Sequence, residues 1–102
     1  MVNRLQIELP MADIERFCQK WQITEFALFG SVLREDFGPE RDVDALVTFR
    51  SAAPWTLWNL IEMRDELGAL LGRPVDMVEK RALRNPFRRR EILATRQVVY
   101  AS

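Results

Sequence analysis

Segments with helical periodicity alternate along the chain with short apolar runs, and this alternation constrains the fold more than any other feature. The segments expected to be helical are 11–22, 31–36, 54–71 and 86–96. The segments expected to be strands are 24–30, 42–49, 73–80 and 97–101. Such an order is typical of an α/β unit in which helices flank a sheet. With 102 residues, 48% of them apolar, we expect a single domain over 1–102.

The helix ends carry recognisable signals. Pro54 is expected to open the long helix and Gly72 to stop it, while Asn85 is expected to cap the last helix. The long helix has an apolar stripe, formed by Leu57, Leu60, Ile61, Leu67, Gly68 and Leu71. Trp55 and Trp58 fall off this stripe. Two interpretations of these tryptophans stay open: packing under a loop, or anchoring a partner protein.

Composition excludes several kinds of site. The chain has no histidine, which rules out Ser-His-Asp and Cys-His catalysis and any histidine ligand. Its one cysteine, Cys18, allows neither an internal disulfide nor a cysteine-rich zinc site, and its place beside an apolar helix stripe indicates a core residue. Lys and Arg total 15, as do Asp and Glu, so no whole-chain field favours nucleic acid or membrane. With no signal peptide or membrane span apparent, we expect a cytoplasmic protein without a stable nucleic-acid partner.

Asp42 and Asp44 stand one residue apart in the strand pattern DVDALVTF, so their carboxylates face the same way. Two such charges repel each other and raise a pKa unless a cation lies between them. Oxygen ligands suit Mg²⁺ or Mn²⁺, and a two-metal site holds its ions roughly 3.5–4 Å apart. Asp76, inside the apolar run PVDMV, is the candidate for a third ligand, because a charge there is costly without a partner. The alternative is that these carboxylates pair with basic residues and serve structure only.

The pair Gly30-Ser31 lies just upstream of the aspartates, after an apolar run. Glycine allows close backbone approach, and the N–H groups of Ser31 and Val32 open a short helix whose start attracts phosphate. A phosphate-binding turn beside metal-binding carboxylates indicates a nucleoside triphosphate with bound Mg²⁺.

Gly30, Ser31, Asp42, Asp44 and Asp76 together form the pattern G-S-x10-D-x-D with a later strand aspartate. This pattern resembles the DNA polymerase beta-type nucleotidyltransferase superfamily. The small size resembles its minimal nucleotidyltransferases, the antitoxin-like partners of HEPN toxins. The resemblance implies a palm fold, a small mixed β-sheet flanked by helices.

The resemblance also implies a role for each residue. Gly30, Ser31 and Arg34 would hold the nucleotide triphosphate, although Arg34 is equally well read as a surface charge. Asp42, Asp44 and Asp76 would be both catalytic and metal-binding: the first two would hold two Mg²⁺, replaceable by Mn²⁺. Asp76 would bind the catalytic metal and help activate the acceptor hydroxyl.

The implied activity is transfer of a nucleoside monophosphate, AMP from ATP, to a hydroxyl, namely a tyrosine of a HEPN toxin. The chain would then act as the antitoxin, in a homo- or hetero-oligomer, and the toxin would form part of the acceptor side. Two residues depart from the family pattern: Glu35 stands where glycine is frequent, and Arg41 where serine or threonine is frequent. Two alternatives therefore stay open. One is a catalytically weak antitoxin that acts by binding, and the other is an enzyme for a small molecule or nucleic-acid end.

A run of basic residues, KRALRNPFRRR at 80–90, has two interpretations. One is a solvated loop and helix start, which we favour because a charge run alone is weak evidence. The other is a contact for triphosphate, RNA or an acidic partner.

Overall fold

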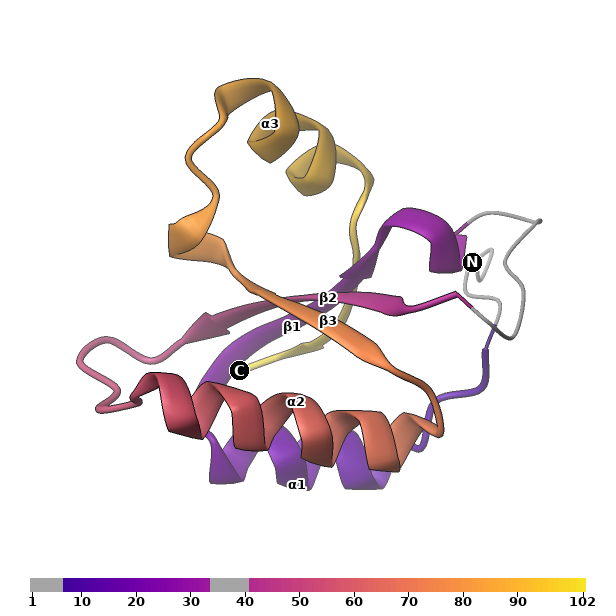
Figure 1. The fold of residues 1–102 in the computed structure, drawn as a ribbon, viewed down its shortest axis with the longest axis vertical. Coiled ribbons are helices and arrows are strands. Elements are labelled where there is room, and N and C mark those ends of the chain that lie inside the picture. Colours follow the sequence, from indigo (N-terminus) through magenta and orange to yellow (C-terminus); the bar gives the residue numbers. More distant parts are fainter. Residues whose placement is uncertain (1–6, 34–40) are drawn as a thin grey trace.

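A computed structural model describes residues 7–33 and 41–102. Its helices and strands follow the order expected from the sequence (Figure 1). They are α1 (Met11–Lys20), β1 (Ile23–Phe29), η1 (Gly30–Leu33), β2 (Val43–Phe49), α2 (Leu57–Leu71), β3 (Val75–Glu79), η2 (Lys80–Ala82), α3 (Pro86–Thr95) and β4 (Gln97–Ala101). Here η marks a short 3-10 helix. The expected short helix 31–36 is this 3-10 turn as far as Leu33, and residues 34–36 lie outside the described part.

The four strands form one mixed sheet in the order β3-β2-β1-β4. β1 pairs antiparallel with both β2 and β4, while β2 and β3 run parallel and are joined through α2. This arrangement confirms the expected class, a small mixed sheet flanked by helices. It also makes β3 one edge of the sheet, next to β2.

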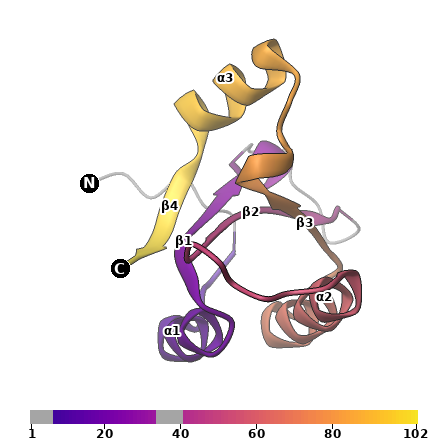
Figure 2. The same cartoon turned by 90° about the vertical axis from the view of Figure 1, so that its left-hand side faces the viewer.

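Helices cover both faces of the sheet (Figures 1 and 2). α1 and α2 lie side by side on one face, and α3 lies on the other. Residues that alternate along β2 supply the two cores, as the expected strand pattern requires. Val43, Ala45 and Val47 belong to the core under α1 and α2, whereas Leu46 belongs to the core with Ile92 of α3.

α2 begins later than the sequence suggested. Thr56, not Pro54, precedes the first turn: its side chain accepts from the Asn59 backbone N–H, and the Asn59 side chain accepts from the Thr56 N–H at 3.0 Å. This reciprocal capping fixes the helix start at Leu57. Gly72 ends the helix at a φ of 69°, as expected. The other elements differ from their expected bounds by one or two residues at an end.

The expected apolar stripe of α2 is partly wrong. Met63 and Leu67, four residues apart on one face, are the buried residues of this helix. Leu57 is 70% exposed. Ten residues separate Leu57 from Leu67, which places them about 80° apart around the helix axis, so only the later residue reaches the core.

Glu66 on α2 forms hydrogen bonds with residues at the C-terminal end of α1. Its carboxylate accepts from Lys20 Nζ at 2.5 Å and from Trp21 Nε1 at 2.8 Å. Burial acts to raise the pKa of Glu66, but the hydrogen bonds from Lys20 and Trp21 outweigh it and lower the pKa overall.

Cys18 on α1 is a core residue, as expected, and burial raises the pKa of its thiol to about 12.

The two undecided tryptophans have different surroundings. Trp55 donates from Nε1 to the Trp21 carbonyl oxygen at 2.8 Å, and the two rings meet edge to face with centroids 5.1 Å apart. Trp55 therefore packs against the core. Trp58, in the first turn of α2, is 75% exposed.

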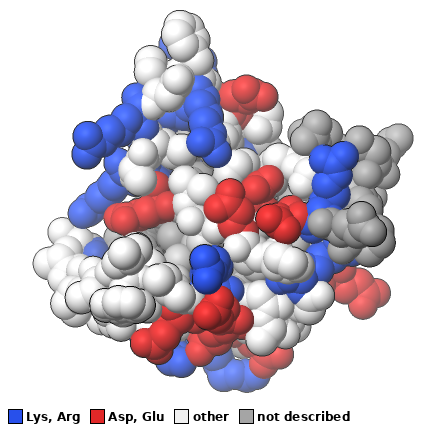
Figure 3. Space-filling model, in the orientation of Figure 1, with Lys and Arg blue, Asp and Glu red and all other residues white. Residues whose placement is uncertain are grey.

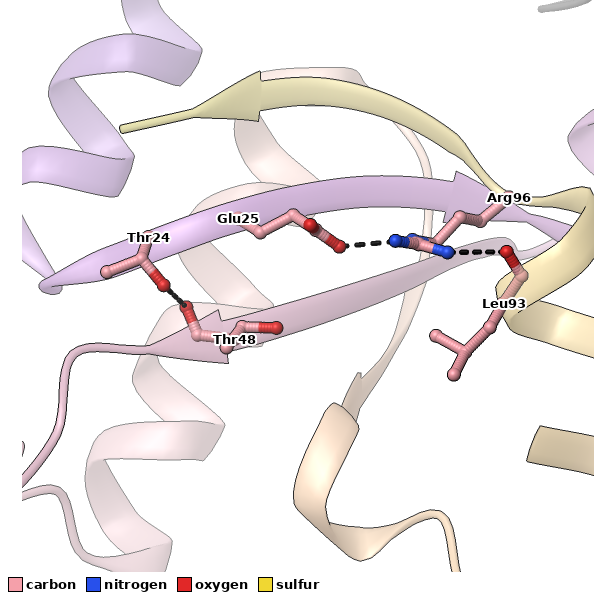
Figure 4. Close-up of polar contacts among 5 residues, drawn as sticks. All are labelled: Thr24, Glu25, Thr48, Leu93 and Arg96. Carbon is pink, nitrogen blue, oxygen red and sulfur yellow. Dashed lines mark hydrogen bonds and ion pairs between the residues drawn. The ribbon is translucent and has the colours of Figure 1, made fainter. Parts of the chain in front are cut away.

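The connection from α3 to β4 is held against β1 (Figure 4). Arg96 donates from Nε to Glu25 Oε2 at 3.0 Å, and its guanidinium also donates to the Leu93 carbonyl oxygen. Both charged side chains are largely buried, with 21% and 24% exposure. This ion pair fixes the C-terminal end of α3 over the sheet. Within the described part of the chain, no helix is long and apolar enough to cross a membrane.

Candidate active site

The site is built on the turn that follows β1. Gly30 has a φ of 72°, a conformation that favours glycine. A Cβ atom added to Gly30 would overlap Oδ2 of Asp44 on the neighbouring strand. The absence of a side chain at Gly30 is therefore what lets the Asp44 carboxylate lie against the turn.

Ser31 links this turn to both aspartates. Its backbone N–H donates to the Asp44 carboxylate, and its Oγ donates to the Asp42 carbonyl oxygen at 3.4 Å. Gly30 and Ser31 thus contact the carboxylate of Asp44 and the backbone of Asp42. Arg41, which departs from the family pattern, is exposed and precedes Asp42.

The sheet register brings Asp76 next to Asp44. The two residues are paired partners on the parallel strands β2 and β3, and Asp44 is also paired with Phe29 at the end of β1. Asp42 precedes Asp44 by two residues, just before β2 begins. All three predicted carboxylates therefore belong to the same end of adjacent strands.

The expectation that Asp76 carries a buried charge is wrong. Its position inside an apolar run suggested a buried charge, but Asp76 is exposed, because β3 is an edge strand. The exposed Asp76 carboxylate stays hydrated, so burial does not require a cation or a hydrogen-bond donor beside it. Its pairing with Asp44 is what connects it to the site.

Asp44 is electrostatically unfavourable as a free carboxylate. Its pKa is raised, first by burial, then by the negative charges of Asp76 and Asp42. The Ser31 N–H and the Arg88 guanidinium act in the opposite direction without cancelling these effects. A cation bound among the three carboxylates would relieve this repulsion.

The donor set fits Mg²⁺ or Mn²⁺, since it consists of carboxylate oxygens. In residues 7–33 and 41–102, no three Asp, Glu, His or Cys side chains already form a group that could hold an ion. Asp42 and Asp76 are exposed, and Asp44 neighbours Asp42 along the chain and Asp76 across the sheet.

Arg88 is the residue that sequence reasoning missed. It was one of several basic residues in the 80–90 run, and nothing distinguished it there. Arg88 precedes Ile92 by one helical turn, and Asp44 precedes Leu46 by one strand repeat, but only the packing of α3 on the sheet relates these two spacings. The packing of Ile92 in the same core as Leu46 brings these two charges together. Arg34 and Glu35 lie outside the described residues, so the predicted nucleotide contact of Arg34 stays a prediction.

A groove of about 230 Å³ adjoins Asp76 on the α2 side. Its other lining residues come from α2 and β3: Leu57, Leu60, Ile61, Arg64, Met77 and Glu79. The groove gives an approach to Asp76 that does not pass over the Gly30 turn, because its lining includes no residue of β1 or η1.

Comparison with known sequences identifies a family. The nucleotidyltransferase domain family matches residues 14–99. A Methanocaldococcus jannaschii protein described as a candidate protein adenylyltransferase is 34% identical over 74 residues, which are 72% of this chain and 74% of that relative. The protein adenylyltransferase MntA of Thermococcus cleftensis is 34% identical over 82 residues, 80% of this chain and 78% of that relative.

Solved structures share the fold. A toxin–antitoxin crystal structure with AMP-PNP superposes with a TM-score of 0.73 at 18% identity, covering 92% of this chain and 75% of that one. A tri-AMPylated Shewanella oneidensis HEPN toxin in complex with its MNT antitoxin gives a TM-score of 0.63 at 17% identity, with coverages of 90% and 70%. At these identities the likeness establishes the fold.

Proposed function

This chain belongs to the nucleotidyltransferase domain family, and on that premise we propose that it transfers AMP from ATP to a tyrosine hydroxyl of a HEPN toxin, which makes it an antitoxin. The observation that carries this proposal is the arrangement of Asp44. Its carboxylate lies against Gly30, accepts from the Ser31 N–H and is paired in register with Asp76.

In this proposal the Gly30–Ser31 turn binds the triphosphate, with Arg34 as a further predicted contact. Asp42, Asp44 and Asp76 hold two Mg²⁺, or Mn²⁺ in their place. When bound there, the metal ions supply positive charge that stabilises both the attacking and the leaving oxygen of the displacement. The chain's own contribution is to fix the α-phosphate beside the carboxylates, because positioning supplies much of the rate of such a transfer.

The transfer itself is an in-line displacement. The tyrosine oxygen forms a bond to the α-phosphorus, and the bond from that phosphorus to the oxygen that bridges to the β-phosphate breaks. Pyrophosphate leaves with the bonding electron pair. Asp76 orients the acceptor by accepting the hydrogen bond of its hydroxyl and takes up the released proton.

The relatives support this choice of donor and acceptor. MntA of Thermococcus cleftensis is a protein adenylyltransferase, and the Shewanella oneidensis complex joins an AMPylated HEPN toxin to an antitoxin of this fold. The AMP-PNP complex of another toxin–antitoxin pair also supports ATP as donor. We propose a cytoplasmic site of action, where the lone buried thiol of Cys18 stays reduced.

The proposal is tested by removing the carboxylate charges one at a time. Purified chain, a HEPN toxin, α-labelled ATP and Mg²⁺ are combined, and label transfer to the toxin is measured. Asp42→Asn, Asp44→Asn and Asp76→Asn should each lose about a hundredfold or more of the rate, because each removes a ligand charge at the reacting phosphate. Asp65→Asn is the matched control, since Asp65 is an exposed aspartate on α2.

The same variants separate an enzyme from a binder. Loss of label transfer together with loss of protection against the toxin in cells supports enzymatic neutralisation. If the Asp42→Asn, Asp44→Asn double variant still protects cells fully, the chain neutralises its partner by binding alone and the enzymatic proposal is wrong. Label appearing on a small molecule or a nucleic-acid end, and not on the toxin, would contradict the proposed acceptor.

A further inference from the structure

We propose that Arg88 contacts the triphosphate of the bound nucleotide, so that the first turn of α3 forms a wall of the nucleotide site. This inference rests on the proposed function and adds one residue to that site. It also divides the basic run 80–90 into one residue that acts at the site and others that do not.

Packing places Arg88 at the correct end of the sheet. Ile92 of α3 shares a core with Phe29 and Leu46. Phe29 is the residue before Gly30 and the strand partner of Asp44, and Leu46 follows Asp44 by two residues on the same strand face. α3 therefore packs, through Ile92, against the two residues that neighbour Gly30 and Asp44 in the sheet.

Helical geometry distinguishes Arg88 from the neighbouring arginines, Arg89 and Arg90. Four residues separate it from Ile92, so the two side chains lie about 40° apart around the helix axis, on the face toward the sheet. Arg90 lies about 160° from Ile92, on the face away from the sheet. Arg89 is held elsewhere, because its guanidinium donates to the Lys80 carbonyl oxygen at 3.2 Å. The electrostatic effect of Arg88 on Asp44 agrees with this placement.

The backbone at the start of α3 is already occupied. Asn85 Oδ1 accepts from the N–H groups of Phe87 at 3.0 Å and Arg88 at 3.1 Å. Phosphate recognition by α3 therefore falls to a side chain. Arginine is suited to it, since its planar guanidinium can donate two parallel hydrogen bonds to phosphate oxygens.

Charge explains why a cation is needed at this point. Asp42, Asp44 and Asp76 are acidic, and a triphosphate adds further negative charge to the same place. Figure 3 shows Lys and Arg side chains gathered at the α3 end of this face, above a group of Asp and Glu side chains. Without nucleotide, Arg88 partly offsets Asp44. With metal ions on the carboxylates, its guanidinium is available to the phosphate oxygens.

The test compares Arg88→Ala, Arg88→Lys and the matched control Arg90→Ala. Each variant is melted in EDTA and in Mn²⁺ with increasing ATP, and the ATP dissociation constant is taken from the shift relative to its own EDTA baseline. Arg88→Ala should bind ATP about tenfold more weakly or worse, the loss expected for one charge-assisted hydrogen bond. Arg88→Lys should be intermediate, and Arg90→Ala should stay within about twofold of wild type. The KM for ATP should follow the same order.

Three outcomes would overturn the inference. If Arg88→Ala and Arg90→Ala bind ATP equally well, while wild type responds to ATP, Arg88 is only a counterion of Asp44 and the proposed function stands. A purely structural Arg88 would lower the EDTA melting temperature without changing the ATP dissociation constant. If wild type itself gains no stability from Mn²⁺ and ATP, both this inference and the proposed function are wrong.

Discussion

Gly30 and Asp44 depend on each other. The turn at Gly30 needs a positive φ and an empty Cβ position, because the Asp44 carboxylate occupies the space a methyl group would take. Gly72, which ends α2, has nearly the same φ of 69° but no atom within 4 Å of its Cβ position. Gly30 and Gly72 thus have the same backbone requirement and different surroundings.

This pair gives a matched prediction. Gly30→Ala and Gly72→Ala should each cost about 1–2 kcal/mol of folding free energy, because an L-residue is strained at this φ. Only Gly30→Ala should also lose Mn²⁺-dependent ATP binding, since the new methyl group displaces Asp44. Chemical denaturation gives the stability, and thermal shift with Mn²⁺ and ATP gives the binding. Equal retention of ATP binding in both variants would contradict the role assigned to the turn.

Asp44 should carry a cost for stability. Because its pKa in the folded protein is raised above the ordinary 3.8, the charged form is disfavoured in the folded state. As pH rises from below 3.8 through the raised pKa, the free energy of unfolding of the wild-type protein falls, and this loss is complete above that pKa. Asp44→Asn avoids the loss.

We therefore predict that Asp44→Asn has a higher melting temperature than wild type at neutral pH in EDTA. The difference should shrink as pH falls through the raised pKa of Asp44, since the wild-type carboxylate is then protonated and also uncharged. Melting curves between pH 4 and 8 test this, with Asp65→Asn as an exposed control expected to show little change. An Asp44→Asn protein less stable than wild type at pH 7 in EDTA would contradict the electrostatic description of the site.

At the scale of helices and strands, the sequence predicted most of what local patterns can encode. Strand alternation placed Val43 and Leu46 in different cores, and Asn85 and Gly72 marked helix ends correctly. The start of α2 was misplaced because Pro54 is a common first-turn residue, whereas the actual cap depends on two reciprocal bonds between Thr56 and Asn59. Such reciprocity is a property of the folded backbone and is weakly visible in residue types.

Trp55 and Trp58 lie on either side of this helix start, and substituting them tests how the start of α2 packs. Trp55→Ala should cost about 3 kcal/mol or more, because it removes a partly buried ring and the hydrogen bond to Trp21. Trp58→Ala should change stability by about 0.5 kcal/mol or less, since the ring is 75% exposed. Urea denaturation measures both. A large loss on Trp58→Ala would show that α2 packs differently from this structure.

At the scale of the whole molecule, the site depends on contacts distant in sequence. The order β3-β2-β1-β4 sets Asp76 beside Asp44 and leaves β3 at an edge. Residue periodicity does not determine strand order, so neither the exposure of Asp76 nor its pairing with Asp44 could be read from the sequence. Arg88 was missed for the same reason: its role depends on how α3 packs on the sheet, and a run of arginines looks alike in sequence.

The proposed activity requires that Asp42, Asp44 and Asp76 hold metal ions for a nucleotide bound on the Gly30–Ser31 turn. Thermal unfolding in EDTA and in Mn²⁺ with ATP at about a hundred times its dissociation constant tests it most directly. Ligand linkage predicts a gain of about 2.7 kcal/mol for wild type, roughly 10 °C or more in melting temperature for a domain of this size. The Asp42→Asn, Asp44→Asn double variant should show no such gain. Equal melting of wild type in the two conditions, or an undiminished gain in the double variant, would contradict the claim.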